Sequence, residues 1–125
     1  MLNDILLYVG SIMITLWGIA HLIPTKSIVS GFGEISEDNK KIITMESIAE
    51  GLTLCFIGVL VLLVTILVGS QDPAAFIVYL ASAVMLLAMA VLTLLTGART
   101  SILPYKICPA VKTIVAVLFF LGSIL

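Results

Sequence analysis

Four long runs of apolar residues make up most of the chain, and three more polar joints separate them. A helix needs roughly 20 mostly apolar residues to cross a bilayer. The runs cover about residues 5–23, 42–69, 75–96 and 107–125. Because unpaired backbone groups are costly in lipid, each run is predicted to be an α-helix. The pattern therefore predicts an all-α polytopic membrane protein, a bundle of four transmembrane helices that forms one membrane domain over residues 1–125.

The second and third joints are short and contain residues that break helices. The segment GSQDPAA, residues 69–75, is a tight turn, so the helices on either side of it are predicted to form an antiparallel hairpin. The segment 96–109 contains two prolines. Pro109 is predicted to lie in the first turn of the last helix, where its missing N–H does no harm.

The first joint, residues 24–41, is longer and partly apolar. Its apolar residues share the spacing of one helical face: Ile28, Val29, Phe32 and Ile35. This pattern predicts a short helix in the membrane interface, and the glycines at 31 and 33 leave an irregular loop as the alternative. Ser36 is predicted to cap the next helix, with Glu37 and Asp38 in its first turn.

The composition agrees with a membrane protein. Hydrophobic residues are 62% of the chain and charged residues 10%, whereas soluble domains are about 45–50% apolar and about 25% charged. A net charge of -1 gives no basic field, so nucleic acid is excluded as a partner and the lipid bilayer is expected. The N-terminal run lacks a basic segment before it and is predicted to be a retained helix rather than a signal peptide.

The positive charges predict an orientation. All six lysines and arginines lie in or beside the first and third joints: Lys26, Lys40, Lys41, Arg99, Lys106 and Lys112. Loops that carry such residues stay on the cytoplasmic side. We therefore expect a multi-pass protein of the cytoplasmic membrane whose loops 24–41 and 97–106 are cytoplasmic and whose two termini are outside.

Polar side chains inside the spans are the candidates for function, because ionisable groups in a membrane usually face the interior of a bundle. Glu46 and Glu50 lie one turn apart on one stripe of the second helix. The neighbouring stripe consists of small residues, Ser47, Gly51, Cys55 and Gly58, which should pack closely against another helix. The candidates for ligand binding or proton relay are Glu50, Glu46, His21, Lys112, Trp17 and Arg99.

Most of these residues also have a structural interpretation. Glu46 and Lys112 could extend to the headgroups, and Glu50 could form an ion pair with Lys112 or Arg99. His21 could be an interfacial histidine hydrogen-bonded to a neighbour. The side chain of Trp17, on the same helical face as His21, could pack in the bundle or wall a cavity.

The positions of the cysteines and of the possible metal ligands argue against a disulfide and against a metal site. Cys108 lies at the entry of the last helix and Cys55 roughly 19 Å deep in the second, so no disulfide is expected. Both are interpreted as buried apolar side chains. His21, Glu46 and Glu50 are acceptable metal ligands, but the chain has no E-x-x-H pair, and no metal site is predicted. The sequence does not identify a cofactor.

Several segments resemble the DoxX-like family of small four-helix membrane proteins. They are GIAHLIP at the end of the first helix, GFGEI after it, ESIAEGLTLCFIGVLVLL in the second helix, and the basic GARTSILPYK before the last. The resemblance implies a four-helix bundle with Glu50 as the family's second-helix carboxylate. Some members belong to redox complexes, including thiosulfate–quinone chemistry with a partner subunit. Glu46 and His21 depart from the family pattern.

These observations favour a polar pocket in the cytoplasmic leaflet. It would bind a lipid-like or quinone-like small molecule, or the protein would be an accessory subunit of a membrane complex, redox complexes included. The alternatives are a small enzyme that uses Glu50 and His21 for proton transfer, or a transporter or channel that must oligomerise. A homo-oligomer or a partner subunit fits each of these. No phosphate loop, nucleophile triad or nucleotide fingerprint is present.

Overall fold

The computed structural model describes residues 1–125 as helices joined by short turns, without strands. The elements in chain order are α1 (Leu2–Leu22), α2 (Thr25–Ser30), α3 (Glu37–Leu67), α4 (Pro73–Leu95), the 3₁₀ turn η1 (Gly97–Arg99) and α5 (Leu103–Ile124). Helices α1, α3 and α5, and the segment Pro73–Arg99 that contains α4, are long and apolar enough to cross a bilayer. The predicted all-α bundle of four spanning helices is confirmed, and the chain is a multi-pass membrane protein.

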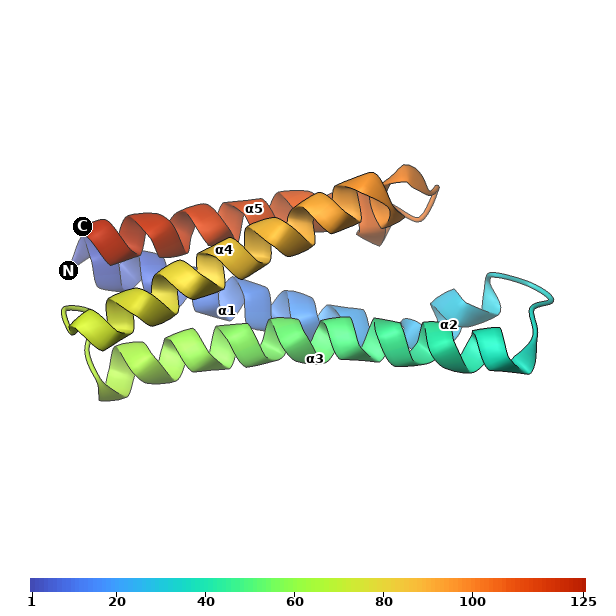
Figure 1. Cartoon of the computed structure of the whole chain (residues 1–125), viewed down its shortest axis with the longest axis horizontal. Coiled ribbons are helices and arrows are strands. Elements are labelled where there is room, and N and C mark those ends of the chain that lie inside the picture. Colours follow the sequence, from blue (N-terminus) through green and yellow to red (C-terminus); the bar gives the residue numbers. More distant parts are fainter.

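The four long helices run antiparallel in chain order (Figure 1). Both termini lie at one end with the α3–α4 turn, and α2 and η1 lie at the other end. Helix α1 packs along α3 and α5, and α4 packs along α5. In contrast, α3 and α4 meet near their connecting turn, and their backbones diverge toward the α2 end.

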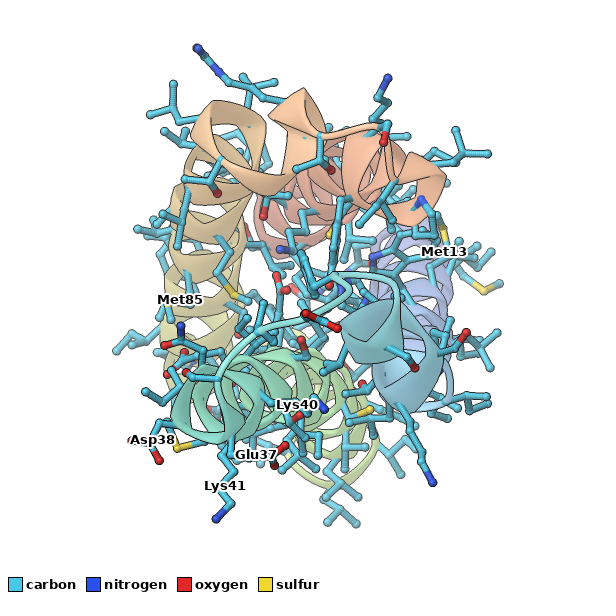
Figure 2. The ribbon with its side chains drawn as sticks, turned by 90° about the vertical axis from the view of Figure 1, so that its right-hand side faces the viewer. Met13, Glu37, Asp38, Lys40, Lys41 and Met85 are labelled. Carbon is cyan, nitrogen blue, oxygen red and sulfur yellow. The ribbon has the colours of Figure 1, made fainter.

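The start of α3 is polar and capped as predicted. The Ser36 hydroxyl accepts a hydrogen bond from the Asn39 N–H at 3.1 Å, which satisfies one of the free donors at a helix N-terminus. Figure 2, viewed from the α2 end, shows Glu37, Lys40 and Lys41 at this tip. Glu37 and Lys40 form an ion pair of 3.6 Å. Helix α3 thus begins five residues before its apolar run at residue 42.

The predicted short helix between the first two spans is present but covers only Thr25–Ser30. Val29 is buried, whereas Phe32 lies beyond the helix and is 45% exposed. Gly33 has a φ of 76°, a left-handed conformation that glycine adopts without strain. The loop alternative therefore applies to residues 31–36, and a position in the membrane interface stays a prediction.

The predicted place of Pro109 is wrong. Helix α5 begins at Leu103, and Pro104 takes the first turn, where its missing N–H is harmless. Pro109 lies inside the helix, where the carbonyl of Tyr105 loses the N–H of residue 109 as a partner. Either Pro104 or Pro109 could occupy the first turn of this helix, and the start of the apolar run at residue 107 favoured Pro109.

Close packing of α1 against α3 confirms that the small-residue stripe faces inward. A Cβ atom added to Gly18 would lie 2.7 Å from Cys55 Sγ and 2.9 Å from the Gly51 carbonyl oxygen. Gly51 and Gly58 of α3 are buried against α1. The opposite stripe is exposed, as predicted for lipid contact: Leu52, Phe56, Val59 and Leu63.

The end with the termini is closed by hydrogen bonds that the sequence did not predict. The hydroxyls of Thr65 and Tyr79 lie 2.7 Å apart in the core between α3 and α4. The Asn3 amide donates to the Ser70 hydroxyl at 3.1 Å, and Ser70 donates to Asp4. These contacts fix the α3–α4 turn to the start of α1 and hold this end of the bundle together.

Candidate functional site

A buried ion pair links three helices near the α2 end. Lys112 of α5 has no exposed surface, and its Nζ donates to an oxygen of Glu50 on α3. The same amine donates to the Thr93 hydroxyl of α4 at 2.9 Å. Of the structural alternatives for Lys112, extension to the headgroups is therefore wrong and pairing with Glu50 is confirmed. The lysine faces the bundle interior, where the carboxylate balances its charge.

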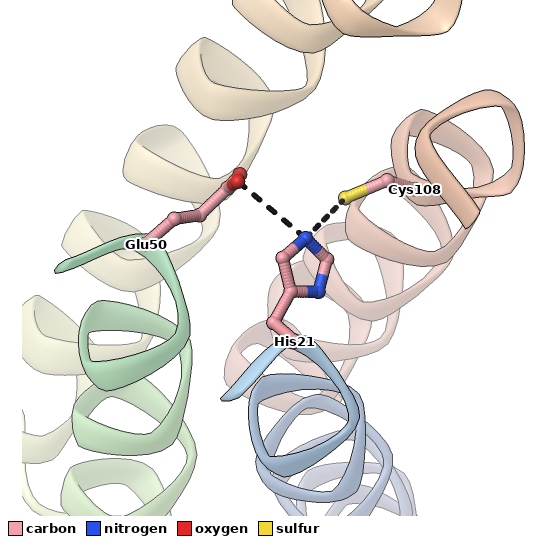
Figure 3. A group of neighbouring side chains, drawn as sticks. All are labelled: His21, Glu50 and Cys108. Atoms are coloured by element: carbon pink, nitrogen blue, oxygen red, sulfur yellow. Dashed lines mark hydrogen bonds and ion pairs between the residues drawn. The ribbon is translucent and has the colours of Figure 1, made fainter. Parts of the chain in front are cut away.

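His21 of α1 lies on the other side of Glu50. Its Nε2 is 3.4 Å from Glu50 Oε2 and 3.8 Å from Cys108 Sγ of α5 (Figure 3). Its Nδ1 is 3.3 Å from the Trp17 carbonyl oxygen. Because a carbonyl only accepts hydrogen bonds, this contact places a proton on Nδ1 and leaves Nε2 facing the carboxylate and the thiol. We call His21, Glu50, Cys108 and Lys112 the buried cluster.

Two aromatic side chains support the buried cluster. The Trp17 indole N–H donates to Cys108 Sγ at 3.3 Å, and its ring meets that of His21 edge-on at 5.7 Å. The Tyr105 ring lies 6.2 Å from His21. Trp17 therefore does more than fill space, since its backbone and side chain each orient a member of the cluster.

Two predicted candidates do not join the cluster. Glu46 lies one helical turn before Glu50, is exposed and forms no ion pair. Arg99 is exposed in η1 and likewise forms none. The alternative ion pair between Glu50 and Arg99 is therefore absent.

Hollows lie on both sides of the cluster. The larger one, the α3–α4 groove, has a volume of about 410 Å³ and is open at the surface. Its lining comprises Glu46, Ser47, Ala49, Glu50, Thr53, Met85, Met89, Leu92, Thr93, Thr96, Gly97 and Tyr105. A second cavity of about 250 Å³ lies between α1, α2 and the start of α5, beside Trp17 and His21. Ser47 and Tyr105 line both spaces.

Sequence reasoning missed Cys108, Thr93 and Tyr105. Cys108 was interpreted as an apolar side chain, although it precedes Lys112 by four residues and so shares its helical face. That spacing was a usable signal. Both cysteines are free, which confirms the expected absence of a disulfide.

Comparison with known proteins adds no assignment: no family model, no curated protein and no solved structure matches this chain.

Proposed function

We propose that this protein binds an amphipathic, lipid-like or quinone-like molecule in the α3–α4 groove. The observation that carries the proposal is the coexistence of a groove that is open at the surface with ionisable groups in its lining. Binding sites for small molecules typically have roughly 300–1,000 Å³ and mostly apolar walls with a few placed polar groups. The groove has about 410 Å³.

The lining of the groove has two kinds of surface. Met85, Met89 and Leu92 of α4 supply flexible apolar walls that suit an acyl or isoprenoid chain. Glu46 and Glu50 of α3 supply carboxylates, which when ionised accept hydrogen bonds and donate none. A ligand whose head group carries hydrogen-bond donors, such as a hydroxyl, a quinol or an amine, therefore fits the polar end of the groove best.

The route of entry supports a ligand that dissolves in the membrane. Helices α3 and α4 diverge toward the α2 end, and their outer faces carry exposed apolar side chains such as Leu52 and Val91. A molecule in the surrounding leaflet would reach the groove without crossing water. By the positive-inside rule this leaflet is the cytoplasmic one. Membership of the DoxX-like family is a proposal that rests on the sequence motifs.

The test is native mass spectrometry of the full chain purified in mild detergent, with identification of the small molecules that remain bound. Met89→Trp should fill the groove and remove the bound molecule. Val91→Trp is the matched control, because Val91 is an exposed side chain of the same helix that does not line the groove. An unmodified protein without a bound molecule, or equal occupancy in both variants, would overturn the proposal.

A further inference from the structure

We propose that His21, Glu50 and Cys108 form a binding site for a divalent transition-metal ion, with zinc the best match. The three side chains come from α1, α3 and α5 and converge at one point (Figure 3). One ligand atom from each lies within 4.8 Å of the others. Imidazole, thiolate and carboxylate are the three protein ligand types that zinc takes.

The distances match a tetrahedral ion. Zinc lies about 2.0–2.1 Å from a histidine nitrogen, about 2.0–2.2 Å from a carboxylate oxygen and about 2.3 Å from a thiolate. Tetrahedral angles then separate the nitrogen from the oxygen by about 3.4 Å and from the sulfur by about 3.6 Å. The observed separations from His21 Nε2 are 3.4 Å to Glu50 Oε2 and 3.8 Å to Cys108 Sγ. The third separation, between the Glu50 carboxylate and Cys108 Sγ, is within 4.8 Å, against about 3.6 Å in a tetrahedral site, so admitting an ion needs a closure of at most about 1.2 Å there.

The contacts around the three ligands also suit a metal. Metal-binding histidines usually donate their second ring N–H to a carbonyl or carboxylate, and His21 Nδ1 faces the Trp17 carbonyl oxygen. The Trp17 indole N–H donates to Cys108 Sγ, which stabilises a thiolate. Lys112 holds the other oxygen of Glu50 and leaves Oε2 toward His21.

This geometry differs from that of a cysteine nucleophile with its base. In such a triad the carboxylate orients the histidine through the ring nitrogen that does not face the thiol. Here the carboxylate and the thiol both face Nε2. With the proton of a neutral imidazole on Nδ1, Nε2 and Oε2 present lone pairs to each other, and only a second proton or a metal ion between them makes that contact favourable.

Charge and access leave room for a fourth ligand. On binding zinc, Cys108 loses its thiol proton, so two positive charges of the ion and one of Lys112 face two negative charges of Cys108 and Glu50. One bound hydroxide or anionic group would balance the remainder. The Glu50 side chain is 27% exposed and lines the groove, which provides a path for the ion and an open coordination position.

From the sequence no metal site was predicted for His21, Glu46 and Glu50, because the chain has no E-x-x-H pair and its only histidine lies on another helix. The structure puts Cys108 in the third place and leaves Glu46 exposed. The site does not depend on the lipid-like ligand proposed above. A test with the metal alone therefore succeeds or fails separately from the test for a molecule in the groove.

The experiment uses the full chain in mild detergent, stripped with a chelator and titrated with Zn²⁺ by calorimetry and with Co²⁺ by absorption spectroscopy. We expect one ion per chain and a thiolate-to-cobalt charge-transfer band in the near ultraviolet. Cys108→Ser should abolish that band, and His21→Gln should weaken Zn²⁺ binding by at least about tenfold, the lower bound for losing even an outer-shell partner. Cys55→Ser is the control, because Cys55 is free and outside the cluster.

Three results would overturn the site. They are the absence of saturable binding, a cobalt complex without the charge-transfer band, and equal Zn²⁺ affinity in Cys108→Ser and Cys55→Ser. If a cluster variant does not fold, the cobalt spectrum of Cys55→Ser alone decides, because Cys108 is then the only thiol in the chain.

Discussion

The ion pair between Glu50 and Lys112 predicts an asymmetric response to the removal of either partner. Lys112→Met leaves a carboxylate that is 27% exposed and that can be hydrated from the α3–α4 groove it lines. Glu50→Gln leaves an ammonium with no exposed surface, for which the Thr93 hydroxyl and the new amide are neutral partners. The second change should therefore destabilise the fold more than the first.

The magnitude follows from the burial of the pair. Removing one partner of a buried ion pair typically costs about 3–5 kcal/mol of the free energy of unfolding. We assign about 3 kcal/mol to Lys112→Met and about 5 kcal/mol to Glu50→Gln on that scale. The double variant leaves neither charge in the interior. Its cost should fall short of the sum of the single costs by at least about 2 kcal/mol, within the range of coupling for residues in contact.

The assay is reversible unfolding in mixed micelles of mild detergent and sodium dodecyl sulfate, followed by far-ultraviolet circular dichroism and by the fluorescence of Trp17, the only tryptophan. Arg99→Met serves as control, because Arg99 is an exposed cation without an ion pair and should leave the midpoint unchanged. An interhelical hydrogen bond in a membrane protein contributes on average about 0.6 kcal/mol. Single costs near that value, or strictly additive costs, would refute the argument.

Three further predictions concern packing and the groove. Gly18→Ala puts a Cβ atom 2.8 Å from a backbone nitrogen of α3 and should cost about 1–3 kcal/mol, whereas Gly97→Ala meets its nearest neighbour at 3.5 Å and should leave the unfolding midpoint unchanged. Tyr79→Phe removes a hydroxyl 2.7 Å from that of Thr65 and should cost about 1 kcal/mol in the same unfolding assay. Glu46→Gln should leave the unfolding midpoint unchanged, because this exposed residue has no ion pair. It should lower the amount of co-purified small molecule measured by mass spectrometry, because Glu46 lines the groove. A shifted midpoint with full occupancy of the groove would contradict this role.

The elements and their ends were largely predictable because hydropathy and capping act locally. Ser36 and the four apolar runs each carry their signal within a few residues. Helix α4 begins at Pro73 with Asp72 as its cap, two residues before the predicted start at residue 75. The inward face of α3 was also predictable, because the stripe of small residues that contains Gly51 and Cys55 is next to the stripe that contains the carboxylates. Pro109 was misplaced because two prolines offered the same local signal.

The chemistry of the site was less predictable because it depends on how the helices rotate against one another. Depth along each helix can be counted from the sequence, and it placed His21, Glu50 and Lys112 at similar levels. It does not tell which side of α5 faces α1, and that rotation brings Cys108 to His21. The divergence of α3 from α4 is likewise set by packing of the whole bundle rather than by a motif.

The central claim is that the α3–α4 groove holds a membrane-soluble molecule, and crosslinking in the membrane tests it most directly. A photoreactive amino acid at position 89 points into the groove, and the same residue at position 91 lies on the exposed face of α4. After irradiation of native membranes, mass spectrometry should find one defined small-molecule adduct at position 89 and only heterogeneous bulk lipid at position 91. The same mixture at both positions would contradict the account.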